Sequence, residues 1–587
     1  MASGFTRLRS RAVVIVRPVL LGMALVASLG LGARDTSATH VRSRIPAAGP
    51  LWALPDLDAA NTRAVGGPIS AATVGRLRFA WHAPLYAKDA FDGGMSGTPL
   101  VVGLVVYLQD MRSNVEARSL RTGILLWRRA YNDPSAGPNG VAYAGGVIYG
   151  ATESFAFALD ARTGRQRWRS RTLPRNRNEG IDMAPGVFGG TVYVSTVPGN
   201  FRSFYTSHGA GVLWALDSAT GKPRWSFRTV PFSLWGNPSV NSGGGLWEPP
   251  GFDGHGGVYV DIGNPGPTNA GAPGNVWARS RPGSNLYTNS LVKLDARTGR
   301  VLWHYQVIPH DLYDWDSQLP PIYDPRTRHV YIAGKYGRVL AFEASTGRLL
   351  WQTYVGEHSG HDHDDLLALR GQYARLPKFP FKLEPGEAGG VETPMAFAGE
   401  TLYVPVVNVP YTIEKPGTST GDFVKGTGEM VAIDAATGRR RWDRKLPSSP
   451  YGAATVVNNL VFTTDYSGQV LAFARATGKL VWSAQLSAGT NAQIVVAGDT
   501  LVTAASAPQP GQQPEIVAYR LRVDDRVGDR GDCCLRRCAE LDVLYESSGR
   551  LRTATSTSPP SISSCPIYAS WFPASTITCC RSRIAIR

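Results

Sequence analysis

The segment Ile308–Pro321, IPHDLYDWDSQLPP, brings several side chains that could do chemistry within a few positions. Its acids and its imidazole are His310, Asp311, Asp314 and Asp316. Carboxylate oxygens bind hard cations such as Ca²⁺, and a carboxylate beside a cation stays ionised and can accept a proton from a hydroxyl group. The segment therefore has the composition of a metal-assisted active-site loop. A polar turn whose aspartates cap the ends of strands has the same composition.

Two other stretches of the sequence also contain metal-ligand residue types. The stretch Glu357–Leu367, EHSGHDHDDLL, matches no helix-borne zinc spacing, and we expect a solvated loop. The cysteines of CCLRRC lack histidine partners and a second C-x-x-C, and the absence of C-x-x-C-H excludes an encoded c-type haem attachment site. For His310 we expect a structural hydrogen bond, because a single imidazole has many structural roles.

A sequence repeat predicts the strands that would hold such a site. Seven copies of T-G-x-x-x-W follow an apolar strand-like stretch, as in ALDARTGRQRW and AFEASTGRLLW. The shortest spacings between copies, 40 and 41 residues, fit one four-stranded propeller blade, and the longer ones fit a blade with inserted loops. The tryptophans of the motif are Trp127, Trp168, Trp225, Trp303, Trp351, Trp442 and Trp482.

The repeat predicts an all-β, eight-bladed β-propeller in which the tryptophans dock between neighbouring blades. A large ring with a single N–H donor suits a mostly buried position that meets backbone carbonyls. Trp81 precedes the first motif, and strand-like segments without a tryptophan follow the last. An eighth blade that pairs the N-terminal strand with these C-terminal strands uses both remainders and removes the exposed edges.

The two ends of the chain differ from the repeat. Arginines precede an apolar run of about fifteen residues that ends in small side chains, so residues 1–44 are predicted to be a signal peptide, with an N-terminal membrane anchor as the alternative. The propeller is expected over residues 45–522. Residues 523–587 contain all six cysteines and are expected to be a disordered or loosely structured tail.

The formal net charge of +16 does not indicate nucleic-acid binding. Much of it lies in the N-terminal segment, which holds seven arginines and one acid in 44 residues. The basic residues of the body fall singly in turns, without a basic stripe and interleaved aromatics. We therefore expect no nucleic-acid partner.

The repeats, the opening DLDAANTRAV and the middle of the chain together resemble the quinoprotein alcohol dehydrogenases over roughly residues 50 to 522. That resemblance implies an exported eight-bladed propeller that holds pyrroloquinoline quinone (PQQ) and a calcium or lanthanide ion on its axis. It further implies oxidation of an alcohol or sugar-like hydroxyl and, without a haem domain, a separate electron acceptor such as a cytochrome.

Three stretches resemble the family's site. In LWEPPGFDGHGGVYVDIGNPGP, Trp247 matches the floor under the quinone and Asn264 matches a metal ligand. In PHDLYDWD, similar to the family's HDxWDxD loop, Asp314 matches both a metal ligand and the base that takes the alcohol proton. Asp316 matches the additional aspartate of the lanthanide-using branch. In IAGKYGRVLAF, Lys335 matches the basic residue that contacts the quinone oxygens.

Other positions depart from the family pattern. Thr206 stands where the family has a glutamate metal ligand, and Ser96 stands where it has a glutamate that touches the cofactor. The family's NRG stretch keeps its asparagine here as Asn139 but lacks the arginine, and Glu392 replaces an asparagine. The paired cysteines that cover the quinone in the family have no counterpart in the body. Asp316 and Glu392 could return the charge lost at Thr206.

Three functions follow from these observations. The first is an exported PQQ-dependent dehydrogenase, which explains why Trp247, Asn264, Asp314 and Lys335 occur together. The second is a non-catalytic propeller that acts as an envelope scaffold, which agrees with the loss of early-blade contacts. The third is a propeller that holds a carbohydrate or another ligand on its axis without redox chemistry.

Overall fold

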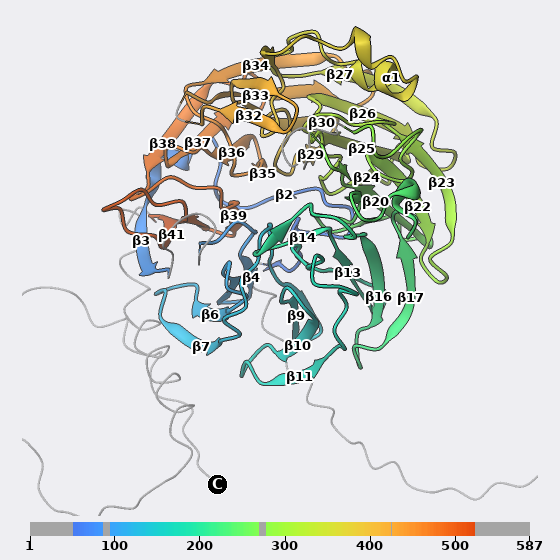
Figure 1. Cartoon of the computed structure of the whole chain (residues 1–587). Helices are drawn as coiled ribbons and strands as arrows, with labels where there is room; N and C mark the ends of the chain where they lie inside the picture. The colour runs from blue at the N-terminus through green and yellow to red at the C-terminus, as the bar shows by residue number, and fades with distance from the viewer. Residues whose placement is uncertain (1–50, 86–93, 269–277, 424, 523–587) are drawn as a thin grey trace, which may run out of the picture.

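The computed structural model describes residues 51–85, 94–268, 278–423 and 425–522. The predicted signal segment and the cysteine-containing tail lie outside these residues. The described chain is all-β and propeller-like, and Figure 1 shows its sheets arranged around a common centre in chain order. Helices are short: α1 (Asp364–Leu369) and the 3-10 turns Val74–Arg76, Leu234–Gly236 and Tyr373–Arg375. No helix in these ranges is long and apolar enough to cross a membrane.

Among the described residues, eight sheets of four or five strands lie around the centre. The first four, each given in its order across the sheet, are β1 (Leu51–Trp52), β4 (Leu100–Val102), β5 (Val105–Gln109), β6 (Val115–Ser119) and β7 (Leu125–Arg129); β8 (Ala142–Ala144), β9 (Val147–Ala151), β10 (Ala156–Asp160) and β11 (Gln166–Arg169); β12 (Gly186–Phe188), β13 (Thr191–Thr196), β16 (Val212–Asp217) and β17 (Pro223–Arg228); and β19 (Gly251–Phe252), β20 (Gly257–Ile262), β22 (Ser290–Asp295) and β23 (Val301–Gln306).

The other four sheets continue the ring. They are β24 (Ile322–Asp324), β25 (His329–Gly334), β26 (Arg338–Glu343) and β27 (Leu349–Tyr354); β29 (Ala396–Ala398), β30 (Thr401–Asn408), β33 (Thr427–Asp434) and β34 (Arg440–Leu446); β2 (Ala64–Val65), β35 (Thr455–Val457), β36 (Leu460–Thr464), β37 (Gln469–Ala474) and β38 (Leu480–Gln485); and β3 (Leu77–Pro84), β41 (Glu515–Leu521), β40 (Thr500–Ala505) and β39 (Val495–Ala497).

Three smaller sheets are formed by other described segments. They are β14 (Gly199–Asn200) with β15 (Ser203–Phe204); β18 (Ser242–Gly243) with β21 (Pro265–Gly266); and β28 (Phe381–Leu383) with β31 (Tyr411–Lys415) and β32 (Thr418–Gly421).

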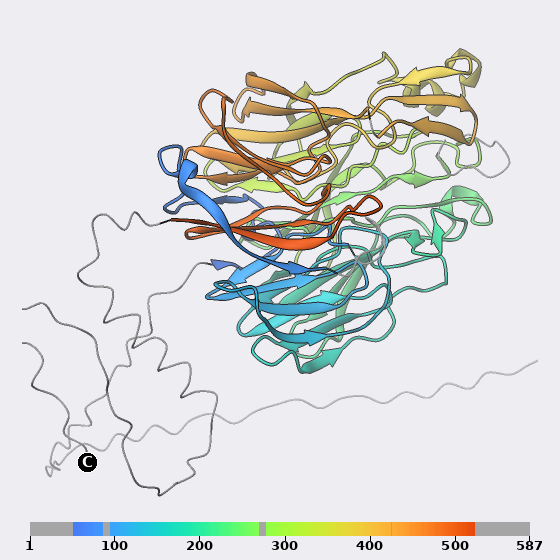
Figure 2. The same ribbon diagram turned by 90° about the vertical axis from the view of Figure 1, so that its left-hand side faces the viewer.

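The last sheet joins the two ends of the described body. β3 pairs antiparallel with β41, with Leu77 opposite Leu521 and Pro84 opposite Glu515. Figure 2 shows the blue N-terminal strand beside the red C-terminal strands. The expected pairing of the strand around Trp81 with the C-terminal strands is therefore present. It leaves neither end of the ring as an open edge.

The repeat motif links each sheet to the next. Trp127 Nε1 donates to the carbonyl of Ala161 at 2.9 Å, and a Cβ added at Gly164 would lie 2.5 Å from the ring of Trp127. Trp81, which precedes the first complete motif, makes the same two contacts with Leu120 and Gly123. Each T-G-x-x-x-W therefore supplies a glycine that receives the preceding tryptophan, and each motif before the last also supplies a tryptophan that covers the next glycine.

The core lies between the faces of neighbouring sheets. One hydrophobic cluster joins Tyr149, Tyr193 and Val260 from three consecutive sheets. Strands such as β13 are buried throughout, whereas the fourth strand of the same sheet, β17, is largely exposed. Apolar packing thus fixes the rigid inner strands, whose connecting loops reach the centre of the ring.

Candidate functional site

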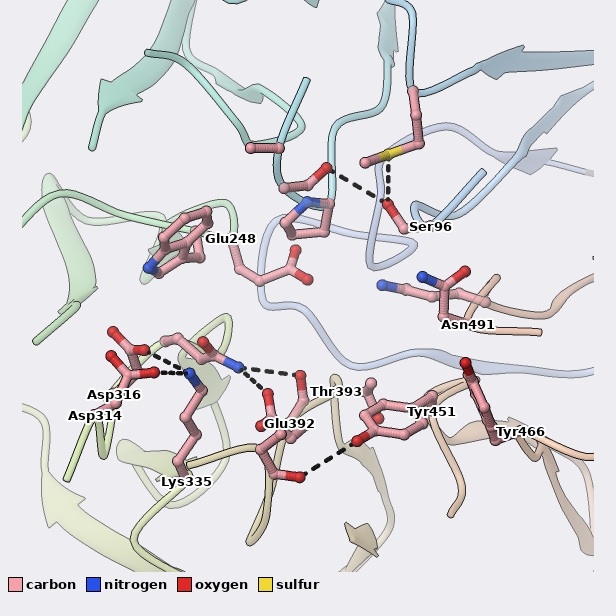
Figure 3. A pocket seen from close by; sticks show the side chains of 18 of the residues that line it. Ser96, Glu248, Asp314, Asp316, Lys335, Glu392, Thr393, Tyr451, Tyr466 and Asn491 are labelled. Carbon is pink, nitrogen blue, oxygen red and sulfur yellow. Dashed lines mark hydrogen bonds and ion pairs between the residues drawn. The ribbon is translucent and has the colours of Figure 1, made fainter. Parts of the chain in front are cut away.

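A cavity of about 540 Å³ opens at the centre of the ring, within the size range of small-molecule sites. Its lining comes from loops as far apart in the sequence as Ser96 and Gln493. Four of the five residues that match the family's site line it: Trp247, Asp314, Asp316 and Lys335. Figure 3 shows that the acid pair and the lysine meet on one side of the opening.

Asp314 lies on a tightly held loop. The buried Asp311 accepts hydrogen bonds from the backbone N–H groups of Tyr313 (2.8 Å) and Trp315 (2.9 Å). Arg281 donates to the Asp311 carbonyl from outside the loop. The backbone of Asp314 adopts a positive φ of 62°, a conformation that aspartate tolerates better than most residues. The loop therefore presents Asp314 to the cavity at a position of local strain, as functional residues often are.

Asn264 and Lys335 hold the two carboxylates of the site together. Lys335 Nζ lies 2.9 Å from Asp314 Oδ2 and 2.9 Å from Asp316 Oδ2. The backbone N–H of Asn264 donates to Asp316 Oδ1 at 2.8 Å, and its Nδ2 donates to Asp314 Oδ1 at 2.6 Å. Asn264 Oδ1 is buried and has no hydrogen-bond partner among the described residues. One amide oxygen beside two carboxylates is a donor set suited to a hard cation.

The charges of this cluster depend on one another. Burial raises the pKa of Asp314 well above its ordinary value. Lys335 lowers this pKa by attraction, and Asp316 raises it by repulsion. Burial alone would lower the pKa of Lys335, but Asp314 and Asp316 outweigh it and hold that pKa well above the ordinary value. Lys335 thus remains a cation, and it supplies the positive charge that keeps two acids together in a buried place.

Glu392 lines the cavity but does not complete a ligand set with the two aspartates. Its Oε2 accepts a hydrogen bond from Gln318 at 2.9 Å. Burial raises its pKa to about 7. In the ranges that the structure describes, no three His, Cys, Asp or Glu side chains are grouped closely enough to hold an ion. The expectation that Asp316 and Glu392 together return to one ion the charge lost at Thr206 is therefore wrong for Glu392.

Trp247 forms an aromatic wall of the cavity. It is buried, and its ring lies nearly parallel to that of Tyr205, with an interplanar angle of 18° and centroids 6.4 Å apart. Glycines let the backbone approach it: a Cβ at Gly137 would lie 2.8 Å from the Trp247 ring, and one at Gly263 would lie 3.2 Å from its Nε1. The flat face of this tryptophan is positioned by packing on several sides.

The positions that depart from the family pattern take different places. Ser96 lines the cavity and donates to Met111 Sδ at 3.2 Å. Thr206 hydrogen-bonds with Ser203 at 2.5 Å and does not line the cavity, whereas its neighbour Tyr205 does. Asn139 is buried and donates to the carbonyl of Asp110. The early loops thus contribute to the cavity, but with few charged groups.

His310 and the Glu357–Leu367 stretch lie beside the Asp314 loop. His310 Nδ1 donates to the carbonyl of Gly283, and burial lowers the pKa of His310 to about 4, as expected of a structural histidine. The prediction of a solvated loop for the stretch is wrong in part. Asp364 is buried and accepts a hydrogen bond from Tyr313 at 2.6 Å, because the stretch folds over the Asp314 loop.

Several lining residues were not found from the sequence. They include Glu248, Tyr451, Tyr466, Asn491 and Gln493. Glu248 directly follows Trp247, and this adjacency was the one local signal that could have indicated it. The other four belong to loops of later sheets, and only the closed ring brings them to the centre.

Comparisons with known proteins agree with this architecture. A family model described as the β-propeller domain of glucose/ethanol/alcohol dehydrogenases matches residues 64–353. A second, described as outer membrane protein assembly factor BamB, matches residues 381–522. A quinohemoprotein alcohol dehydrogenase from Comamonas testosteroni is 28% identical over 522 residues, covering 75% of this chain and 70% of that protein.

Two further similarities concern a shorter match and the fold. The dehydrogenase subunit of a quinone alcohol dehydrogenase from Gluconobacter oxydans is 31% identical over 293 residues, which is 42% of this chain and 36% of that protein. A europium-containing methanol dehydrogenase has the same fold, with a TM-score of 0.66 at 20% identity over 80% of this chain and 98% of that one. Residues 64–353 of this chain therefore match the β-propeller domain of glucose/ethanol/alcohol dehydrogenases, and the chain is similar to quinoprotein alcohol dehydrogenases.

Proposed function

We propose that this chain is an exported PQQ-dependent oxidoreductase that acts on an alcohol or sugar-like hydroxyl. The observation that carries the proposal is the meeting of Trp247, Asp314, Asp316 and Lys335 at one central cavity, with the unpartnered Asn264 Oδ1 beside the acids. A scaffold has no chemical need for this combination. The similarity to quinohemoprotein alcohol dehydrogenases supports the same interpretation.

The residues present fit a hard cation and a flat cofactor. Asn264, Asp314 and Asp316 would hold the cation through amide and carboxylate oxygens, as calcium and lanthanide ions require. A europium-containing methanol dehydrogenase shares the fold, which favours including lanthanides among the candidates. Trp247 would stack against the planar quinone, and Lys335 would contact its oxygens. When bound, the quinone would supply hydride acceptance and the cation would supply Lewis-acid assistance.

The chain itself would supply the proton acceptor and the enclosure. Asp314 Oδ1 or Oδ2 would take the proton of the substrate hydroxyl, because a carboxylate beside a cation is ionised and reaches the cavity. The Asp311 hydrogen bonds would keep the loop from relaxing away from the substrate. Electrons would leave to a separate carrier such as a cytochrome.

The finer features of the architecture belong to the same proposal. We count the eight sheets as eight blades over residues 45–522, with the tryptophan contacts as the docking device of the repeat. The N-terminal segment would direct export or anchor the chain to a membrane.

The experiment mixes the purified chain with PQQ and either calcium or a lanthanide. We expect a shift in quinone absorbance, a rise in melting temperature and dye-linked oxidation of an alcohol. Asp314→Ala should reduce turnover at least about a hundredfold, the range typical of a lost general base. Asp362→Asn, which changes an acid paired with His358 outside the cavity lining, should have no such effect. Absence of quinone binding with every ion would overturn the proposal.

A second candidate is a non-catalytic propeller that binds a protein. The match of residues 381–522 to the model described as outer membrane protein assembly factor BamB favours it, as does the replacement of early cofactor contacts by Ser96, Asn139 and Thr206. A chain that binds no quinone, and whose melting temperature responds to no ion, would fit this candidate.

A further inference from the structure

Glu248 presents a buried carboxyl group to the cavity without a partner from the protein. The residue is 8% exposed and lines the same cavity as Lys335 and Asp314. Figure 3 shows its carboxyl directed into the open centre, away from the acid pair and its lysine. No hydrogen bond to this carboxyl is found among the described residues. A polar group on a cavity wall that the protein leaves without a partner is satisfied by solvent or by a ligand, and is therefore available to a ligand that enters.

The nearest cation does not neutralise Glu248, because its donors are already used. Arg63 is fully buried behind the cavity wall and binds Asp56 Oδ1 at 2.9 Å and Gln493 Oε1 at 2.8 Å. Its other nitrogen atoms donate to Thr455 Oγ1 and to backbone carbonyls. The charge of Arg63 is thus balanced by Asp56, and its geometry is fixed by groups other than Glu248.

The remaining charged groups that face the cavity do not compensate Glu248 either. Lys335 lies between Asp314 and Asp316 and interacts with Glu392. Burial raises the pKa of Glu248 well above its ordinary value; Asp56 raises it further, and Arg63 opposes both. Geometry and electrostatics therefore agree on a neutral carboxyl group, which is a hydrogen-bond donor.

We propose that Glu248 is a ligand-contacting residue whose neutral carboxyl donates a hydrogen bond to a carbonyl or carboxylate oxygen of the planar ligand beside Trp247. This inference rests on the proposed function, since an oxygen-rich quinone is the ligand that would accept the bond. Such a donor matters here because Lys335 is the one basic side chain among the described residues that line the cavity.

The proposal makes binding depend on a proton in a defined direction. A ligand oxygen accepts from the protonated carboxyl and is repelled by the carboxylate, so affinity should fall as the pH rises through the pKa of Glu248. If only the protonated form binds, each pH unit above that pKa lowers affinity about tenfold. Because Glu392 and the Asp314 cluster also titrate, the wild-type profile alone does not identify Glu248. The difference between wild type and Glu248→Gln isolates it.

The test measures PQQ affinity, by quenching of tryptophan fluorescence in the presence of calcium, from about pH 5 to about pH 9. Glu248→Gln keeps a donor that cannot ionise, so its affinity should lie within about threefold of wild type at the acidic end and exceed it progressively at the basic end. Glu248→Ala removes the donor and should weaken binding about tenfold at the acidic end. Glu153→Gln, a control at an acid outside the cavity lining, should keep the wild-type profile.

The outcomes separate the two proposals. Equal pH profiles for wild type and Glu248→Gln, with both binding PQQ, would overturn the role of Glu248 and leave the proposed function standing. Affinity that rises with pH in wild type and is lost in Glu248→Gln would also overturn it, since the carboxylate would then accept a bond from the ligand. Absence of PQQ binding by wild type at every pH would remove both. If Glu248→Ala does not fold, the near-isosteric Glu248→Gln decides alone, and its melting temperature should exceed that of wild type increasingly as the pH rises.

Discussion

Replacement of Lys335 by methionine tests whether the acid pair at the cavity is a cation site. The substitution keeps most of the side-chain volume and removes the charge that lies 2.9 Å from both Asp314 Oδ2 and Asp316 Oδ2. It leaves two neighbouring carboxyl groups without a counter-charge. Either one of them must take up a proton or the folded state must bear their repulsion.

The expected loss of stability is large for a single substitution. At an effective dielectric constant of about 20, each contact at this distance is worth about 6 kcal/mol before desolvation is subtracted. Removal of one partner from a buried pair typically costs about 3–5 kcal/mol once desolvation is included. We therefore expect Lys335→Met to lower the free energy of unfolding by about 3–5 kcal/mol near neutral pH.

A cation should restore that loss if the acids and Asn264 Oδ1 form a binding site. At a free concentration of about one hundred times the dissociation constant, a bound ion adds about 2.7 kcal/mol. Denaturant unfolding, monitored with and without calcium or a lanthanide, measures both effects. The matched control is Lys293→Met, which removes another largely buried lysine, 3.1 Å from a single carboxylate, Asp253, away from the cavity lining.

The control also defines the result that would refute the reasoning. Lys293→Met should regain less stability from a cation than Lys335→Met, because it leaves one carboxylate, Asp253, where Lys335→Met leaves a pair. Ions that stabilise Lys293→Met as much as Lys335→Met would mean that they act on the surface generally. A Lys335→Met protein within about 1 kcal/mol of wild type would mean that the two ion pairs contribute little to stability.

Two further substitutions test parts of the fold around the cavity. Burial raises the pKa of Asp182 from near 3.8 to about 7, so the folded protein holds that proton between these values and wild-type stability falls as the pH rises through them. Asp182→Asn should therefore gain about 2–3 kcal/mol relative to wild type between about pH 5 and about pH 8 in denaturant unfolding, and an equal difference at both pH values would contradict the buried acid. Gly347→Ala, where a Cβ would lie 2.5 Å from the Trp303 ring, should lose about 1–3 kcal/mol more than Gly254→Ala, where nothing lies within 4 Å. Both glycines have nearly the same positive φ, +73° and +74°, so equal melting temperatures for the two variants would argue against tryptophan docking.

The repeat was predictable because each short motif contains one partner of each of two successive contacts, so the pattern recurs along the sequence. A T-G-x-x-x-W unit contains the glycine that accepts one tryptophan and the tryptophan that covers the next glycine, as Gly164 and Trp168 do. Asp311 was within reach of the same kind of reasoning. An aspartate that accepts the N–H groups two and four residues on forms a recognisable turn, but its role in holding Asp314 was not inferred.

The rest of the cavity depends on contacts between distant parts of the chain. Thr206 and Tyr205 are neighbours, and no local pattern tells which of them faces the centre. Asp364 looks like a solvated acid until Tyr313, 51 residues away, is placed over it. Glu248 stands before two prolines as an ordinary polar residue would, and its isolation follows from how Arg63 is engaged on the other side of the wall.

The charge of the cavity sets a condition on what can bind there. Four carboxyl groups line it, from Glu248, Asp314, Asp316 and Glu392, against the single cation of Lys335 in the described residues. An anionic, oxygen-rich ligand can enter such a place only together with positive charge. On the proposed function, that charge arrives in two forms: a cation beside Asn264 and a proton on Glu248. The cation neutralises the aspartate pair and the proton neutralises Glu248, on different walls of the same cavity. Loss of either should therefore weaken ligand binding without abolishing the contribution of the other.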